Sequence, residues 1–127
     1  MPSDIHESGE DYLEAILVLK NKYGFARSVD VAKHLGVSKP SVSRAMSVLE
    51  ETGYIDANKL GSIRLTEKGE SLAAEIYGRH VLLTKFLMKI TNVSEEQASR
   101  NACKIEHDID IDIKKGIERW MNEHAND

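Results

Sequence analysis

The chain of 127 residues has one cysteine and no long apolar run, and each scarcity excludes a class of protein. A single cysteine cannot form an internal disulfide, so we expect a protein of the reducing cytoplasm. No apolar run approaches the roughly 18 residues that a membrane span needs, so we expect no membrane segment. The N-terminus, MPSDIHESGEDYLEAI, is acidic and lacks the pattern of a signal peptide. The remaining composition, 41% hydrophobic and 30% charged, is typical of one compact domain or two small ones.

The formal net charge of −4 is distributed unevenly along the chain. Residues 1–19 carry five acidic side chains and no basic ones, whereas residues 20–69 carry nine Lys or Arg against five acids. Residues 70–127 carry eight basic side chains against eleven acidic ones. A mildly basic middle flanked by acidic ends favours phosphate contact in the middle and cation attraction at the ends.

The segment GVSKPSVSRAMSVLEETGYI, with the residues before it, has the pattern of a helix-turn-helix. A short first helix is marked by Val29, Ala32 and Leu35. Gly36 permits the turn, Ser38 is a good N-cap for the next helix, and Pro40 is tolerated in its first turn. The apolar positions of that helix are Val42, Ala45, Met46 and Leu49. Its outer face is small, polar and basic, and we expect it to enter a DNA major groove; an ordinary helical hairpin with a solvated face is the alternative.

After Gly53, the stretch YIDANKLGSIRLTEKG alternates apolar and polar residues and predicts a hairpin of about residues 54–57 and 62–65. A hairpin directly after a recognition helix is a wing, whose cations could touch phosphates beside the groove. The sequence therefore predicts a winged helix-turn-helix. The residues that we predict to contact DNA are Arg27, Ser38, Lys39, Pro40, Ser41, Ser43, Arg44, Lys59 and Arg64.

The rest of the chain predicts three helices. Thr66 would cap a long helix of roughly 24 residues, Ser94 a second, and the last would span about residues 109–124. So small a helical unit with this much apolar surface would be marginal as a monomer, and a twofold operator needs a dimer. An intramolecular core closed by the first helix of the chain is the alternative, and it is compatible with dimerisation. We predict a mainly α protein with a winged helix-turn-helix DNA-binding domain at 1–71 and an all-helical dimerisation domain at 72–127. Its expected partners are a second copy of the chain and a palindromic double-stranded DNA operator.

The octet CKIEHDID places a thiol, a carboxylate and an imidazole at helical spacing. Cys103, Glu106 and His107 would share one face if this stretch is helical. These are the side chains that bind divalent transition metals. The alternative is a cysteine packed in a core beside two solvated residues. The octet alone does not decide between them, because a metal site also needs ligands from elsewhere in the chain.

The arrangement resembles the metal-dependent repressors that include the diphtheria toxin repressor and the manganese transport regulators. The resemblance covers nearly the whole chain and is carried by EDYLEAI, SKPSVSRAMSVLEETGYI, LTEKGESLA, RHVLLTKFL and CKIEHDI. It implies a site for Mn2+ or Fe2+ whose ligands fall on Asp11, Glu14, His80, Glu106 and His107. It also implies repression of metal-uptake genes when the ion is plentiful. Because the chain ends soon after Trp120, we expect no SH3-like domain of the kind that longer members carry.

Cys103 departs from the manganese-type pattern, which has a carboxylate there, whereas Asp11 departs from the iron-type pattern, which has methionine there. A thiolate favours softer or later metals, and the carboxylates favour hard ions. The sequence is therefore a hybrid that leaves the physiological ion open. We predict Cys103 as a sixth ligand; the alternative is a small unligated hydrophobic residue.

Two other functions are compatible with parts of the sequence. A winged-helix regulator could respond to a small organic ligand or to oxidation of Cys103, although the acidic set of Asp11, Glu14 and Glu106 argues against it. Carboxylate and imidazole ligands also build hydrolytic metal sites. The sequence offers no nucleophile and no phosphate-binding glycine-rich loop that would support catalysis, so we do not expect an enzyme.

Overall fold

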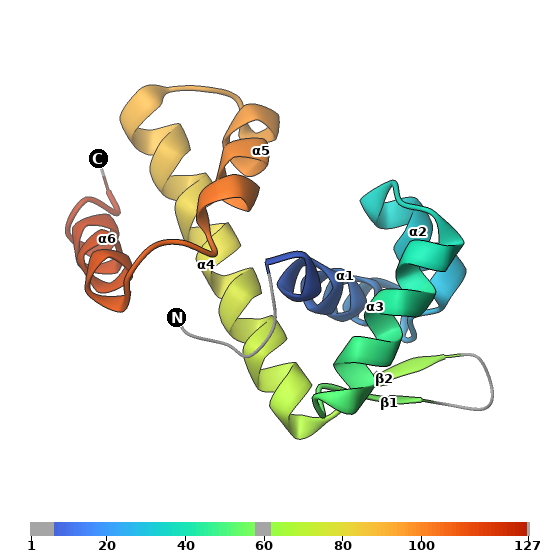
Figure 1. Cartoon of the computed structure of the whole chain (residues 1–127). Coiled ribbons are helices and arrows are strands. Elements are labelled where there is room, and N and C mark those ends of the chain that lie inside the picture. The colour runs from blue at the N-terminus through green and yellow to red at the C-terminus, as the bar shows by residue number, and fades with distance from the viewer. Residues whose placement is uncertain (1–6, 58–61, 127) are drawn as a thin grey trace. The chain divides into compact units, whose positions relative to one another are not determined.

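The structure is a computed structural model that describes residues 7–57 and 62–126. Its elements, in chain order, are α1 (Glu7–Tyr23), α2 (Ser28–Leu35), α3 (Lys39–Glu51), β1 (Ile55–Ala57), β2 (Ile63–Leu65), α4 (Glu67–Thr91), α5 (Glu95–Ile105) and α6 (Ile111–Glu123) (Figure 1). The chain forms two compact units, Ser3–Glu75 and Ile76–Asp127, with the boundary inside α4. We call them the N-terminal unit and the C-terminal unit and describe each by itself.

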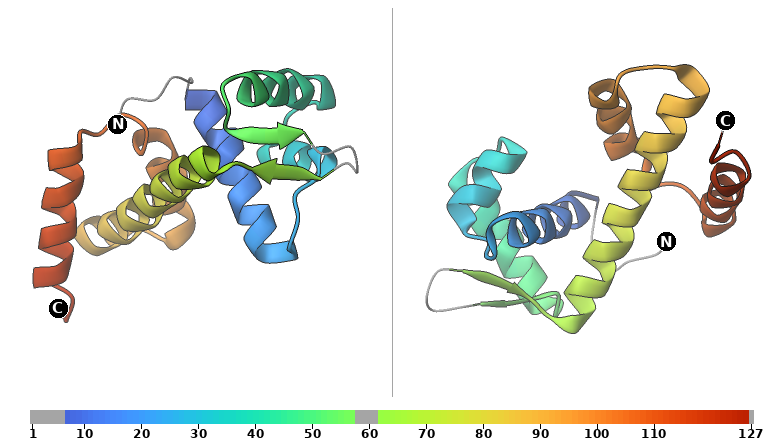
Figure 2. Two further views of the ribbon diagram at one scale, coloured as in Figure 1. Left: turned by 90° about the horizontal axis from the view of Figure 1, so that it is seen from below. Right: turned by 180° about the vertical axis from the view of Figure 1, so that it is seen from behind.

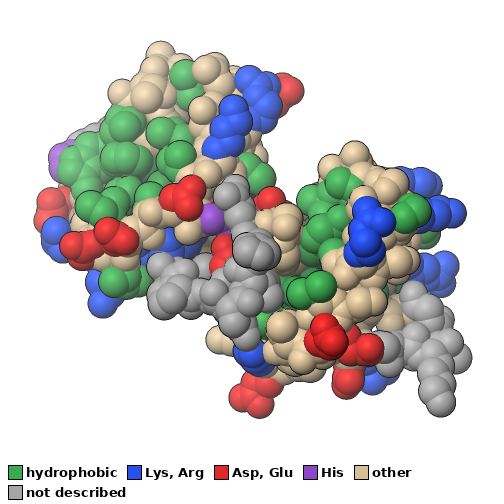
Figure 3. Space-filling view, viewed as in Figure 1, with side chains coloured by type: hydrophobic (Ala, Val, Ile, Leu, Met, Phe, Trp, Pro, Cys, Tyr) green, Lys and Arg blue, Asp and Glu red, His purple; other side chains and the backbone are tan. Residues whose placement is uncertain are grey.

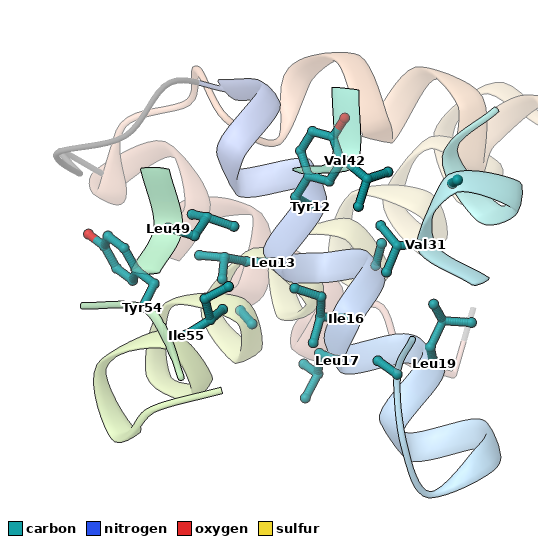
Figure 4. Packing of buried hydrophobic residues seen from close by; sticks show 14 residues of the cluster. Tyr12, Leu13, Ile16, Leu17, Leu19, Val31, Val42, Leu49, Tyr54 and Ile55 are labelled. Carbon is teal, nitrogen blue, oxygen red and sulfur yellow. The ribbon is translucent and has the colours of Figure 1, made fainter. Parts of the chain in front are cut away.

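The core of the N-terminal unit is built around α1. Leu13 and Ile16 lie three residues apart on one face of this helix, and both are fully buried. They pack against apolar side chains from α2, α3 and the hairpin, as Figure 4 shows for Val31, Leu49 and Ile55. The helix extends as far as Tyr23, but this tyrosine is 57% exposed, so the buried face of α1 stops before the end of the helix.

The helix-turn-helix forms as the sequence predicts. Gly36 ends α2 in the left-handed conformation, with φ 68°, which glycine adopts without the steric cost that a Cβ imposes. Ser38 then caps α3 by accepting a hydrogen bond from the backbone N–H of Ser41. Val42 and Leu49 of α3 are buried in the core. The sequence pattern placed Val29 on the buried face of α2. In the structure Val29 is partly exposed, and Val31 is buried instead.

The wing is a two-stranded antiparallel hairpin that follows α3 and leads into α4 (Figure 2). Thr66 joins the two ends of the hairpin: its hydroxyl donates to the carbonyl of Gly53 and accepts from the N–H of Gly69. A Cβ at Gly69 would overlap the backbone carbonyl of Tyr54, so only glycine allows α4 to pass this close to the hairpin. The backbone of Arg27 adds an isolated antiparallel bridge to Ser62, the residue before β2.

The C-terminal unit consists of the remainder of α4 with α5 and α6. Ser94 caps α5 by accepting from the N–H of Gln97, as predicted. The last helix begins at Ile111, two residues later than the sequence suggested, after the extended N-cap residue Asp110. No residue of α6 is buried, although Trp120 makes an edge contact with Phe86, with ring centroids 5.6 Å apart. Hydrophobic side chains gather on the surface over α4 and α6 (Figure 3). Among the described residues, no helix is long and apolar enough to cross a membrane.

Candidate metal centre and nucleic-acid interface

Two of the predicted metal ligands lie where α5 ends. Cys103 is in the last turn of the helix, and Glu106 is its C-cap residue with helical backbone angles, φ −61° and ψ −25°. The two side chains are three residues apart and therefore face the same way. The helix ends at Ile105, so His107 lies in the turn that follows rather than on the helix, in contrast to the single helical face considered from the sequence.

His80 of α4 faces this end of α5. Its Nδ1 lies 2.9 Å from Oε2 of Glu106, and its Nε2 lies 3.0 Å from the hydroxyl oxygen of Ser99. The His80 side chain is 19% exposed and that of Glu106 is fully buried. Both nitrogens of the imidazole are therefore held by side chains of α5.

His80, Cys103 and Glu106 each offer one ligand atom, and these three atoms lie within 4.8 Å of one another. In a tetrahedral site with bonds of about 2.0–2.3 Å, ligand atoms are about 3–4 Å apart, so a small closing movement would bring these three into contact with one ion. Thiolate, imidazole and carboxylate together suit a late or borderline transition metal.

The second oxygen of Glu106 also fits a cation. Among the described residues, Oε1 accepts no hydrogen bond, although it is buried. Nε2 of His107 lies 3.4 Å from this oxygen. A buried carboxylate oxygen without a donor is costly, and a bound cation would remove that cost. This oxygen, with the three-residue cluster, shows that the residues present fit a metal ion.

Arg79 supports the segment that carries Glu106 and His107. Its side chain is fully buried, and Nη1 donates to the carbonyl of Ile109 at 2.7 Å and to that of Glu106 at 3.4 Å. A cation at the carbonyl end of a helix is favourable because the last carbonyls have no partner within the helix. Arg79 and Ser99 are parts of the site that the sequence did not predict, since only the packing of α4 on α5 shows what they contact.

The other two predicted ligands, Asp11 and Glu14, are in the N-terminal unit. Both belong to α1 and are three residues apart, so they lie on one side of this helix as the spacing predicts. Their role as ligands remains a prediction from the sequence.

The predicted DNA-reading residues lie on the outside of α3. Lys39, Pro40, Ser43 and Arg44 are exposed, together with the cap residue Ser38. A chain of hydrogen bonds runs along this face: the hydroxyls of Ser38 and Ser41 are 2.9 Å apart, and Nη2 of Arg44 donates to Ser41 Oγ at 3.3 Å. Arg44 is therefore held over the first turn of the helix, where a recognition helix contacts bases.

Other cations are exposed elsewhere on the N-terminal unit. Arg27 is the N-cap residue of α2, and its guanidinium lies 4.8 Å from the centre of the Phe25 ring. Lys33 and His34, which sequence reasoning overlooked, line a surface pocket together with Arg27. Arg64 is exposed on β2, opposite Asp56. Lys and Arg side chains are visible along the side of the unit where α2 and α3 lie (Figure 3). Lys59 falls outside the described residues.

Known proteins match both units. Residues 4–62 match the family model described as iron dependent repressor, N-terminal DNA binding domain, and residues 66–127 match iron dependent repressor, metal binding and dimerisation domain. The transcriptional regulator MntR of Escherichia coli O6:H1 is 35% identical over 116 residues, which cover 91% of this chain and 74% of MntR. The chain belongs to the iron-dependent repressor family.

Solved structures of this family have the same fold. The IdeR protein of T. acidophilum matches all of the chain with a TM-score of 0.80 and 25% identity, over 57% of its own length. The manganese regulator SloR matches 90% of the chain with a TM-score of 0.81 and 27% identity, over 53% of its length. The chain thus spans about half the length of these two solved proteins. The resemblance to metal-dependent repressors and the predicted winged, mainly helical fold are both confirmed.

Proposed function

We propose that this member of the iron-dependent repressor family binds Mn2+ or Fe2+ and, as a homodimer in the cytoplasm, represses metal-uptake genes by binding a palindromic operator. The observation that carries the proposal is the cluster of His80, Cys103 and Glu106, with a buried oxygen of Glu106 that accepts no hydrogen bond from the described residues. A divalent ion there would be a point of high positive charge held by three side chains from two helices.

Asp11, Glu14 and His107 are proposed as further ligands. His107 is supported by its 3.4 Å approach to Glu106, whereas Asp11 and Glu14 rest on the sequence resemblance. Ligands from α1, in the DNA-binding half, and from α4 and α5 would then be joined through one ion. Metal binding would favour one placement of the two recognition helices of a dimer, so that metal and DNA each strengthen the binding of the other by the same factor.

The DNA side of the proposal divides the predicted residues by role. Arg44, with Lys39 and the serines of α3, would read base edges in the major groove. Arg27, Arg64 and Lys59 would contact phosphates and fix the register of the protein on the duplex. The exposed outer face of α3 and the hydrogen bond that positions Arg44 support this division.

The test is a metal titration of DNA binding by the full chain. An operator is first selected from random duplexes with the metal-loaded protein, and its affinity is then measured with chelator and with each ion in turn. We expect Mn2+ or Fe2+ to tighten binding, and His80→Ala and Glu106→Ala to remain folded dimers that no longer respond to metal. Glu96→Ala, an exposed carboxylate of the same helix, is the control and should respond normally. Full metal activation of both His80→Ala and Glu106→Ala would reject the site.

Cys103 determines which ion the site prefers. If its sulfur binds metal, the cobalt(II) complex will show sulfur-to-metal charge transfer, and Cys103→Glu will improve activation by manganese relative to iron, because carboxylate suits the harder ion. No charge-transfer band, together with unchanged metal preference in Cys103→Ser, would leave Cys103 as an exposed cysteine that is not a ligand.

A further inference from the structure

Three polar side chains of α5 lie on the face that meets His80. Ser99, Cys103 and Glu106 are spaced by four and three residues, which places them in one row along the helix. Cys103 and Glu106 belong to the candidate metal cluster, whereas Ser99 carries a hydroxyl rather than a thiol, imidazole or carboxylate. Its hydroxyl instead lies 3.0 Å from Nε2 of His80.

This contact bears on which nitrogen of His80 could bind an ion. A neutral imidazole has one nitrogen that carries a proton and one that offers a lone pair, and a metal takes the lone pair. Nδ1 faces Glu106, a carboxylate of the cluster, at 2.9 Å. Nε2 faces a hydroxyl, which makes a good hydrogen-bond partner but a poor ligand for a transition metal. The surroundings of the ring therefore differ on its two sides.

We propose that Ser99 is the positioning residue of His80: it holds Nε2–H by accepting its hydrogen bond and so presents Nδ1 to the metal. The inference rests on the metal site proposed above. A histidine that binds metal through one nitrogen commonly donates its other N–H to a neighbouring acceptor, which fixes the tautomer and the orientation of the ring. Ser99 supplies that acceptor from the same helix that carries Cys103 and Glu106.

A hydroxyl suits this position because it can either donate or accept. In the tautomer with the proton on Nδ1, that nitrogen would donate to Glu106 and the Ser99 hydroxyl would donate to Nε2. A metal held through Nδ1 would require the other tautomer, with the proton on Nε2, and the same hydroxyl, rotated, would accept that N–H. The ring carries one proton in both tautomers, so it needs no new hydrogen-bond partner.

The test compares Ser99→Ala and Ser99→Thr in the full chain, with Arg100→Ala as the control from the exposed face of α5. Zinc(II) serves as the diamagnetic probe. Affinity is measured in competition with a chromophoric chelator, and nitrogen-15 spectra of the imidazoles report which nitrogen of His80 carries the proton. The melting temperature of the metal-free protein shows whether each variant remains folded.

We expect the zinc form of the wild-type chain to have the proton on Nε2 of His80 and the metal shift on Nδ1. Ser99→Ala should bind zinc about 10–100-fold more weakly, and Ser99→Thr, which keeps a hydroxyl, should recover most of the affinity. Arg100→Ala should bind zinc as the wild-type chain does. An alanine variant that is folded and binds zinc normally, or a metal shift on Nε2, would overturn the inference.

His80→Ala separates this inference from the proposed function. If His80→Ala abolishes tight zinc binding while Ser99→Ala does not weaken it, the metal site stands and the role of Ser99 is wrong. If neither substitution changes zinc affinity, His80 is no ligand and the inference about Ser99 fails, whereas the proposed function is rejected only if Glu106→Ala also leaves metal activation intact.

Discussion

The two units of the chain have interiors of different kinds. Fourteen of the described residues form the apolar core of the N-terminal unit, and the side chains from its helices and its hairpin point toward one another (Figure 4). The buried apolar residues of the C-terminal unit are few and half of them are alanines, namely Ile76, Leu83, Ala98 and Ala102. Its interior also contains charged and polar side chains, among them Arg79 and Glu106.

The difference indicates what each unit needs in order to be stable. The N-terminal unit obtains its stability from apolar burial within its own sequence. Both units leave some large apolar side chains exposed, among them Tyr23 and Val48 in the N-terminal unit and Ile90, Ile111 and Ile113 in the C-terminal unit. The C-terminal unit also buries a carboxylate oxygen that accepts no hydrogen bond from the described residues. Exposed apolar surface of this kind indicates a partner, and the family to which the chain belongs dimerises through this region. A second subunit and an ion would supply what the C-terminal unit lacks.

Of the substitutions that test this difference between the units, Gly69→Ala in the N-terminal unit should change stability the most. A Cβ at this position would overlap the backbone carbonyl of Tyr54, which no side-chain movement can relieve. We expect the free energy of unfolding to fall by about 4 kcal/mol or more. Gly78→Ala, in the same helix but with no atom within 4 Å of the added methyl, is the control and should stabilise the protein by up to about 1 kcal/mol. Equal effects in denaturant melts would refute the close approach.

The next prediction compares a buried apolar side chain of the N-terminal unit with an exposed one of the C-terminal unit. Leu13→Ala removes a fully buried side chain from the N-terminal core and should lower the free energy of unfolding by about 3 kcal/mol. Ile113→Ala removes a side chain that is 53% exposed, so it should lower the free energy of unfolding of the monomer by less than about 0.5 kcal/mol. Sedimentation should instead show weaker self-association for Ile113→Glu. A dimer unaffected by that glutamate would place the subunit interface elsewhere.

A smaller effect is expected from Arg79→Met in the C-terminal unit. Methionine keeps much of the volume but loses the hydrogen bonds to the carbonyls of Glu106 and Ile109, so stability should fall by about 2 kcal/mol. Arg100→Ala removes an exposed arginine 3.8 Å from Glu96 and should change stability by less than about 0.5 kcal/mol. Similar losses for both arginines would contradict a polar interior that stabilises this unit.

The smallest effect on stability should come from Arg44→Ala, within about 0.5 kcal/mol, because this side chain is exposed. Its effect on binding to the selected operator should be about 1–3 kcal/mol if it reads a base. Ser41→Ala, which removes the hydroxyl that holds Arg44, should weaken the same binding to a lesser extent. Unchanged operator affinity in Arg44→Ala would exclude it as a reader.

The sequence by itself determined the elements and their order. Caps at Ser38, Thr66 and Ser94 and the turn at Gly36 act through neighbouring backbone, so a local pattern suffices to predict them. The apolar positions of α3 repeat at helical spacing for the same local reason. Motifs in both halves also identified the family, and the matches to the two family models confirm it.

Only the tertiary structure decided how the groups that lie far apart in sequence meet. His80 and Glu106 are separated by 26 residues, and the requirement for glycine at position 69 arises from a carbonyl 15 residues earlier. No periodic pattern in the sequence predicts that Ser99 faces one nitrogen of His80 or that Arg79 donates to the carbonyls after α5. Such contacts depend on how α4 packs against α5, and that packing follows from the whole set of buried side chains rather than from any one segment.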